Sequence, residues 1–269
     1  MVNEDTYEIY QTVLFNKWIV GKYEPIDSEY NGFINKRGIL VLLNKKLVSK
    51  YINDVKDMWI WNLSGDDADL LMKEYPSMFK STRKAPTLIH KVDNEFIALT
   101  GHKYKKIRNA HSRYKNIVTI SNKLNNEADV LKLINDWKTQ RDGVYFRFTL
   151  SGEKYFMSNH INNKSLENLY FYIDDKLIGY SVIEKIDNFH YNLLFRKVDL
   201  DYSQLTYYID YISYKNVFEK SKLDYIRINC GDASYKNLLY YKERNFNIDG
   251  QFMVTSLQLK NSNTIKKLF

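Results

Sequence analysis

Cysteine and proline are scarce in this sequence of 269 residues, which has one of the first and three of the second. A single cysteine excludes an internal disulfide, and with five scattered histidines it disfavours a structural zinc site. No run of 18 apolar residues occurs, and the N-terminus lacks the basic-then-apolar form of a signal peptide. We therefore expect a soluble, cytoplasmic protein with no metal and no tightly bound cofactor.

Several catalytic motifs are missing as well. There is no Gly-x-Ser-x-Gly elbow, no Gly-x-x-x-x-Gly-Lys-Ser/Thr loop and no His-Glu-x-x-His pair. These absences disfavour a serine hydrolase of the α/β type, a P-loop nucleotidase and a zinc protease.

Aromatic residues and positive charge, in contrast, are abundant. The content of 44% hydrophobic and 15% aromatic residues argues against disorder. The formal net charge of +8 suggests an anionic partner such as nucleic acid, a phosphorylated cofactor or a lipid surface. No carboxylate occurs between Glu95 and Glu127.

The stretch GHKYKKIRNAHSRYKN, residues 101–116, carries six Lys or Arg within this acid-free span. As a helix over 102–116 it would turn an inward stripe toward the core, made of Tyr104, Ile107, His111 and Tyr114. Cations on both sides of the stripe would meet phosphates, and the candidates are Lys105, Lys106, Arg108 and Arg113. The two arginines could instead hold one phosphate or carboxylate together. The alternative is a solvated helix whose charges only aid solubility.

The first half of the chain is predicted to be rich in helices. We expect a helix under Asp5, a strand over 38–43, a helix capped by Ser64, a strand over 87–92 and a short helix capped by Asp93. A further helix over 127–142 would stop at Gly143.

The second half is predicted to begin with a β-hairpin that turns at Asp174-Asp175, followed by a third strand. A helix over 200–221 starting under Asp201 or Ser203, a strand ending at Cys230, a helix over 233–246 and a closing strand follow. This order is typical of N-acyltransferases of the GNAT type, an analogy that sets an expectation of fold only. We divide the chain into two halves, residues 1–145 and 146–269.

The basic stretch resembles a motif of one family, typified by the C-terminal domain of phosphatidylglycerol lysyltransferases. The matching residues are Gly101, Lys103, Tyr104, Arg108, Asn109, Arg113 and Tyr114, while His102 stands where Lys is usual. Two later segments are similar to that family: 194–199, which keeps Phe195, Lys197 and Asp199, and 229–246, which keeps Asn229, Asp232 and Lys242. The resemblance implies an α+β protein of two fused GNAT-like halves, related to Fem-type peptidyltransferases.

The sequence departs from the family at two acids. Arg196 stands where Glu is expected, and the later segment lacks the family's Glu. Because those acids would recognise a cationic aminoacyl group, the usual substrate is in doubt. The segment LDYSQLTYY also contains no glycine, where ordinary acetyltransferases grip the pyrophosphate of coenzyme A with a glycine-rich turn. The resemblance therefore favours aminoacyl-tRNA over acyl-coenzyme A as the donor.

Acyl transfer to an amine or hydroxyl needs a base, donors for the oxyanion and a proton for the leaving group. We assign Asp232, with Asn229, to holding or deprotonating the acceptor, Lys197 to neutralising a phosphate or oxyanion, and Tyr241 (or Tyr240) to protonating the leaving group. With Lys242, the basic helix would bind the donor. The structural alternatives are a helix cap for Asp232, a surface ion pair for Lys197 and simple packing for the tyrosines.

The sequence thus predicts a GNAT-like acyltransferase whose partner is tRNA or another polyanion. Two alternatives stay open: a non-catalytic nucleic-acid-binding protein on a degenerate acyltransferase scaffold, and a conventional acyl-coenzyme A-dependent N-acetyltransferase.

Overall fold

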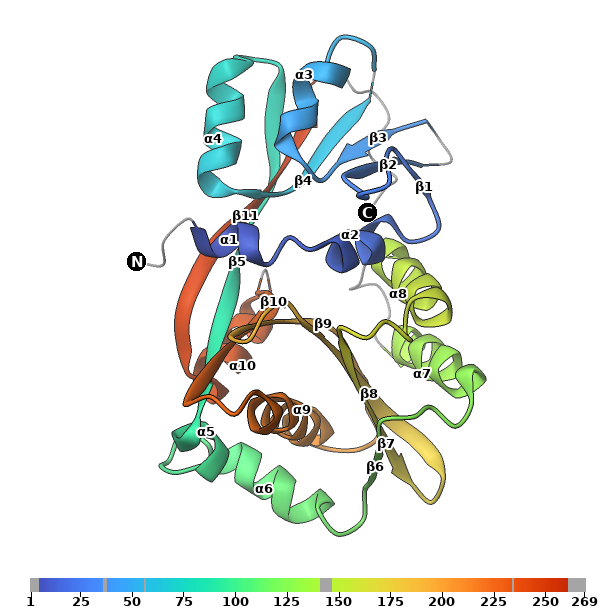
Figure 1. Ribbon diagram of the computed structural model, residues 1–269, viewed down its shortest axis with the longest axis vertical. Coiled ribbons are helices and arrows are strands. Elements are labelled where there is room, and N and C mark those ends of the chain that lie inside the picture. The colour runs from blue at the N-terminus through green and yellow to red at the C-terminus, as the bar shows by residue number, and fades with distance from the viewer. Residues whose placement is uncertain (1–4, 36–37, 56, 141–146, 234, 261–269) are drawn as a thin grey trace.

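One large mixed sheet forms the centre of the protein (Figure 1). The structure is a computed structural model that describes residues 5–35, 38–55, 57–140, 147–233 and 235–260. The strands are β1 (Glu24–Pro25), β2 (Gly32–Ile34), β3 (Leu40–Leu42), β4 (Met58–Ser64), β5 (Phe79–Asp93), β6 (Thr119–Ser121), β7 (Leu166–Ile173), β8 (Lys176–Lys185), β9 (His190–Val198), β10 (Tyr225–Asp232) and β11 (Ile248–Leu259). The helices are α1 (Asp5–Ile9), α2 (Val13–Val20), α3 (Val48–Tyr51), α4 (Gly65–Glu74), α5 (Asn94–Ala98), α6 (Lys105–Tyr114), α7 (Glu127–Gln140), α8 (Arg147–Asn159), α9 (Leu205–Ser221) and α10 (Lys236–Asn245), with a 3-10 turn at Lys45–Leu47.

The strands lie in the order β1-β2-β3-β4-β11-β5-β10-β9-β8-β7-β6. Among the described strands, β3 with β4 and β9 with β10 are parallel pairs, and the other neighbours are antiparallel. This arrangement, with helices on its faces, confirms the predicted α+β fold with a mostly antiparallel sheet.

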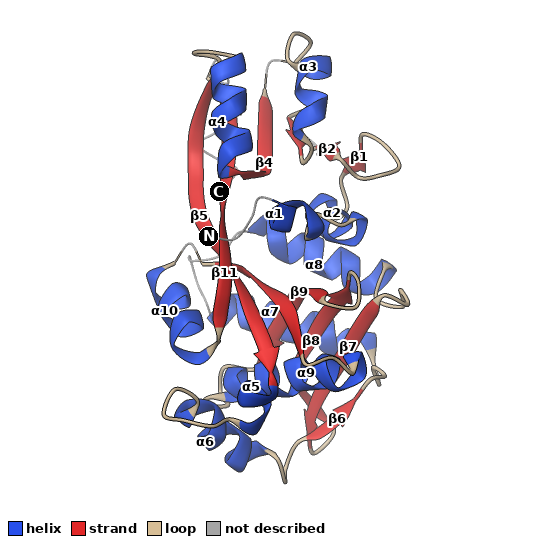
Figure 2. Ribbon diagram, turned by 60° about the vertical axis from the view of Figure 1, so that its left-hand side comes forward, coloured by secondary structure: helices blue, strands red, loops and turns tan. Residues whose placement is uncertain are grey.

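Strands β5 and β11 form a long ribbon that connects the two ends of the sheet (Figure 2). The C-terminal strand β11 pairs with β4 and β5, which both come from the first half of the chain. The predicted strand over 87–92 is therefore only the last part of β5. The predicted boundary between residues 145 and 146 lies outside the described residues, and the division into halves stays a prediction.

Helices cover both faces of the sheet around β7 to β10. On one face, α7 and α8 pack with α2 against a core that includes Phe156, Tyr180 and Phe195. On the other face, α9 packs closely against β8, since a Cβ on Gly179 would lie 2.3 Å from Ile209 Cδ1. Helices α5, α6 and α10 join α9 on this second face.

Two of the predicted helix caps are confirmed. The Ser64 hydroxyl accepts from the Asp67 N–H at 3.0 Å at the start of α4, and the Asp93 carboxylate accepts from the Phe96 N–H at 3.1 Å at the start of α5. The helix predicted under Asp5 is wrong in extent. The segment forms two helices, because α1 ends at Ile9 and Thr12 caps a new helix, α2.

The second half follows the prediction more closely. The hairpin of β7 and β8 turns at Asp174 and Asp175, whose φ angles are 47° and 64°. The predicted helix over 127–142 is α7, although its stop at Gly143 lies outside the described residues. Helix α8 was not predicted at all.

Candidate functional site

Strands β9 and β10 part in the middle of the sheet. They pair in parallel from Arg227 opposite His190 to Asn229 opposite Asn192, and no pairing beyond these residues occurs in the described chain. Strand β9 nevertheless continues along β8 to Val198, and β10 continues along β5 to Asp232. We call this opening between the two strands the strand fork.

Two asparagines close the apex of the strand fork. The Asn229 side-chain amide donates to Asn192 Oδ1 at 3.0 Å, and Asn229 Oδ1 accepts from the Gly231 N–H at 2.8 Å. Asn192 in turn donates to Glu184 Oε2 at 3.1 Å, and burial raises the pKa of Glu184. Asn229 is buried and engaged at both ends of its amide, so it clamps the two strands together.

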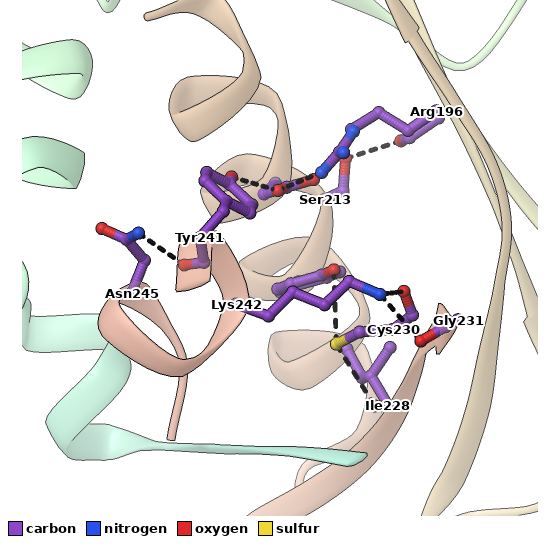
Figure 3. Close-up of polar contacts among 11 residues, drawn as sticks. Arg196, Ser213, Ile228, Cys230, Gly231, Tyr241, Lys242 and Asn245 are labelled. Atoms are coloured by element: carbon purple, nitrogen blue, oxygen red, sulfur yellow. Dashed lines mark hydrogen bonds and ion pairs between the residues drawn. The ribbon is translucent and has the colours of Figure 1, made fainter. Parts of the chain in front are cut away.

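A buried group of polar side chains lies on the α9 and α10 face of the fork (Figure 3). The Tyr241 hydroxyl donates to Asp210 Oδ2 at 2.6 Å, and the Arg196 guanidinium pairs with the same oxygen. Asp210 is only 1% exposed. Burial, and after it the negative charge of Asp210, raise the pKa of Tyr241. Tyr241 is therefore a protonated donor at neutral pH.

Lys242 lies beside this group and fills a gap that the fork creates. Its Nζ donates to the carbonyl oxygens of Cys230 and Gly231 at 2.6 and 2.7 Å (Figure 3). These carbonyls follow the last residue of β10 that pairs with β9. An unpaired buried carbonyl is costly, so the ammonium takes the place of a strand partner. Burial lowers the pKa of Lys242 to about 8.

Lys197 follows Arg196 on β9, and consecutive residues of a strand point to opposite faces of the sheet. Because Arg196 lies on the face of Asp210 and Tyr241, Lys197 lies on the other face. Its Nζ pairs with Glu153 Oε2 of α8 at 2.6 Å and lies 4.7 Å from the centroid of the Trp137 ring. Glu153 is 3% exposed and also accepts from the Tyr180 hydroxyl. The structure therefore does not bring Lys197 together with Tyr241 and Lys242. Its predicted surface ion pair is instead a buried one.

The basic helix packs as its pattern predicts, with one change. Tyr104, Ile107 and Tyr114 are buried, while His111 is only partly buried and its neighbour Ala110 is fully buried. Helix α6 spans Lys105–Tyr114, so it is shorter than the predicted range 102–116.

The two arginines of α6 bind different segments of backbone. Arg108 donates to the carbonyl oxygens of Leu99 and Gly101, the latter at 2.6 Å, and so fixes the turn before its own helix. Arg113 donates to the carbonyl oxygen of Ser203 at 3.2 Å, just before α9. The structure therefore does not show both guanidinium groups at one anion.

The cations of α6 nevertheless reach the start of α9, on the same side as Tyr241. Lys106 Nζ lies 5.9 Å from the centroid of the Tyr207 ring, and that ring lies 5.0 Å from the ring of Tyr241. Lys105 and Lys106 are exposed. The basic helix and the strand fork are thus connected through the first turn of α9.

The start of α9 differs from the prediction. The helix begins at Leu205 under Gln204, not under Asp201 or Ser203, and Gln204 has a left-handed φ of 66°. The Ser203 carbonyl accepts from the Tyr114 hydroxyl at 2.6 Å as well as from Arg113. This turn therefore presents a carbonyl oxygen to α6, whereas an anion would require N–H groups.

Asp232 ends β10 opposite Thr87, and its side chain lies outside the part of the structure that is described. The predicted helix over 233–246 begins later, at Lys236, with Tyr235 at its N-cap position. Asp210 and Glu153, the acids that pair with Arg196 and Lys197, were not predicted from the sequence. The one sequence feature that points to these acids is the alternation of side chains along β9. It places Arg196 and Lys197 on opposite faces, so each cation needs its own partner.

A second feature of the described surface lies between α1 and α4, away from the fork. It is a depression of about 630 Å³, and its lining includes Glu8, Asp66, Asp67 and Lys73. In the described residues no group of His, Cys, Asp and Glu is arranged to hold a metal ion. No described helix has the length and apolar character needed to cross a bilayer.

No protein-family model and no curated protein matches the sequence. Many solved structures match, and three of those that cover almost the whole chain are the following. L-PGS from Bacillus licheniformis has a TM-score of 0.62 at 9% identity, covering 98% of this chain and 93% of its own. The C-terminal domain (DUF2156) of a protein described as a lysylphosphatidylglycerol synthetase from Agrobacterium fabrum has a TM-score of 0.57 at 13% identity. The match covers 95% of this chain and 90% of that domain. A conserved protein of unknown function from Bacteroides thetaiotaomicron has a TM-score of 0.62 at 14% identity, covering 95% and 96%.

At these identities the likeness shows the fold alone. The predicted GNAT-like fold, and its likeness to the lysyltransferase C-terminal domain, are confirmed at that level.

Proposed function

We propose that this chain is an acyltransferase that moves an aminoacyl group from aminoacyl-tRNA to an amine or hydroxyl acceptor. The observation that carries the proposal is the strand fork with Tyr241 and Lys242 on one side and the cations of α6 close to it. A fork interrupts a sheet at the cost of backbone hydrogen bonds, and such a defect is typical of a place where a ligand enters.

Each chemical step has a candidate residue at the fork. The Tyr241 hydroxyl is assigned to protonating the leaving ribose oxygen. Its single proton is donated to Asp210 in this structure, so the hydroxyl has to turn from Asp210 to the ribose oxygen for that step. Asp232, at the end of β10, is assigned to the acceptor. The buried Lys242 contributes positive charge to the fork from behind the two β10 carbonyls that it binds. Asn229 acts through the strands that it clamps, as a positioning residue.

The donor is assigned from charge and backbone conformation. Lys105, Lys106 and Arg113 are exposed on α6, and phosphates would release counterions on binding them. The turn before α9 has no glycine and directs the Ser203 carbonyl toward α6, which disfavours a pyrophosphate held by backbone N–H groups. An RNA donor fits these features better than coenzyme A does.

The test is a transfer assay with the purified protein. Bulk tRNA charged with labelled amino acids is mixed with amine or hydroxyl acceptors, and label leaving the tRNA for a new product is measured. We expect transfer by the native chain and a loss of about tenfold or more in Tyr241→Phe, with little change in the exposed neighbour Tyr240→Phe.

Two outcomes would contradict the proposal. Consumption of labelled acetyl-coenzyme A in place of charged tRNA would identify a conventional acetyltransferase. Binding of RNA without turnover of either donor would identify a non-catalytic nucleic-acid-binding protein.

The buried pair changes how the predicted role of Lys197 must be tested. Lys197→Ala alone would leave the carboxylate of Glu153 buried without its cation, so a loss of activity would follow from instability. The double variant Lys197→Met, Glu153→Gln removes both charges. Retained transfer in that variant would show that Lys197 only stabilises the fold.

A further inference from the structure

Two contacts between a cation and an aromatic ring adjoin Tyr241, one through space and one through the chain. Lys106 of α6 lies over Tyr207 of α9, at 5.9 Å, and the Tyr207 ring lies 5.0 Å from that of Tyr241. Arg244 lies over Tyr240, the residue before Tyr241 in α10, with its Cζ 4.4 Å from the ring centroid. We call these two contacts together with Tyr241 the aromatic track.

Packing does not account for Tyr240. This side chain is 51% exposed, whereas Tyr241, the next residue, packs against the core and bonds to Asp210. Tyr207 is partly buried. The guanidinium group of Arg244 fixes the orientation of this large exposed ring, so the ring offers a preformed surface on which another planar group can stack.

The charge around the aromatic track is positive. Lys105, Lys106, Lys236 and Arg244 are all exposed, and within the described chain none of them pairs with a carboxylate. Among the described side chains of α6, α10 and the first two turns of α9, the acids are Glu243, which is exposed, and Asp210, which Arg196 already neutralises. Four cations thus remain against one exposed carboxylate.

Exposed cations bind phosphates, and an exposed aromatic ring stacks on an unpaired base, so this surface suits a ligand that carries both groups. A single strand of nucleic acid presents both, whereas a duplex hides the faces of its bases. We propose that the aromatic track binds the single-stranded 3′ end of an RNA, with a base stacked on Tyr240 and its phosphates at Lys106 and Arg244. This inference rests on the proposed function, since the 3′ end of tRNA carries the acyl group to be transferred.

The experiment is fluorescence polarisation with a labelled single-stranded RNA oligonucleotide and with the same sequence in a duplex. Tyr240→Ala is compared with Tyr155→Ala, a control that removes another exposed tyrosine, 37% exposed on α8. We expect the single strand to bind more tightly than the duplex, and Tyr240→Ala to weaken it about tenfold with an unchanged salt dependence. Lys106→Ala should make the negative slope of log K against log salt shallower by about 0.7.

Equal binding of single strand and duplex, or equal effects of Tyr240→Ala and Tyr155→Ala, would overturn the inference. Coenzyme A, which also carries a base and phosphates, is the competing ligand. If Tyr240→Ala weakened its binding and left the RNA untouched, the inference would again be wrong.

The transfer assay separates this inference from the proposed function. RNA binding that depends on Tyr240 in a protein without transfer activity would support the aromatic track and refute the proposed reaction. Transfer from charged tRNA together with RNA binding that does not change in Tyr240→Ala would support the proposed reaction and refute the aromatic track.

Discussion

The buried ammonium of Lys242 makes the stability of the fold depend on pH in a direction that can be worked out. Burial lowers the pKa of Lys242 to about 8, from an ordinary value of 10.5. Between these two values the unfolded chain binds more protons at this site than the folded chain does. Linkage then requires that the free energy of unfolding rise with pH in that window, by about 2 kcal/mol between pH 8 and pH 10.

Denaturant unfolding at several pH values measures this effect. Lys242→Met removes the titrating group while it keeps the buried tyrosines, so the native curve minus the Lys242→Met curve isolates the lysine. Lys236→Met is the matched control, because Lys236 is exposed on the same helix. We expect the difference curve to rise for Lys242 and to stay flat for Lys236. A flat or falling curve for Lys242 would refute the argument that its ammonium is buried at a cost.

Three substitutions test other contacts, each by the free energy of unfolding. Tyr241→Phe removes one of the two donors to the buried Asp210 carboxylate and should cost about 2 kcal/mol, and a change below about 0.5 kcal/mol would mean that the bond is absent. Gly152→Ala would place a Cβ 2.6 Å from the Trp18 carbonyl oxygen and should cost about 1–3 kcal/mol, so an unchanged or higher stability would disprove the close helix crossing. Ser64→Ala removes the cap of α4 and should cost about 1 kcal/mol, and no loss would show that the cap is dispensable.

Local signals in the sequence predicted the elements whose stability comes from near neighbours in the chain. The caps at Ser64 and Asp93 and the hairpin turn at Asp174-Asp175 are of this kind, since each depends on a few adjacent residues. In α6 the buried positions Ile107 and Tyr114 followed from helical spacing, whereas His111 of the same predicted stripe is only partly buried.

Elements that depend on distant partners could not be predicted in this way. Helix α8 contains Gly152 near its middle, which disfavours a helix, yet the missing side chain lets α8 cross α2 at Trp18. Strand β5 runs through the polar residues 80–84 and Pro86, and it is a strand there because β11 pairs with it throughout.

The sequence by itself determined the elements of the hairpin-rich half and the basic helix, because hydrophobic spacing and turn chemistry act over a few residues. The fold class followed from the order of those elements and from the resemblance to the lysyltransferase domain. Only the tertiary structure decided what the charged side chains do. Arg196 and Lys197 are neighbours in the chain, but the pleat of β9 sends one to Asp210 and the other to Glu153. Those partners lie on different helices that cover opposite faces of the sheet, so no local pattern could have assigned them.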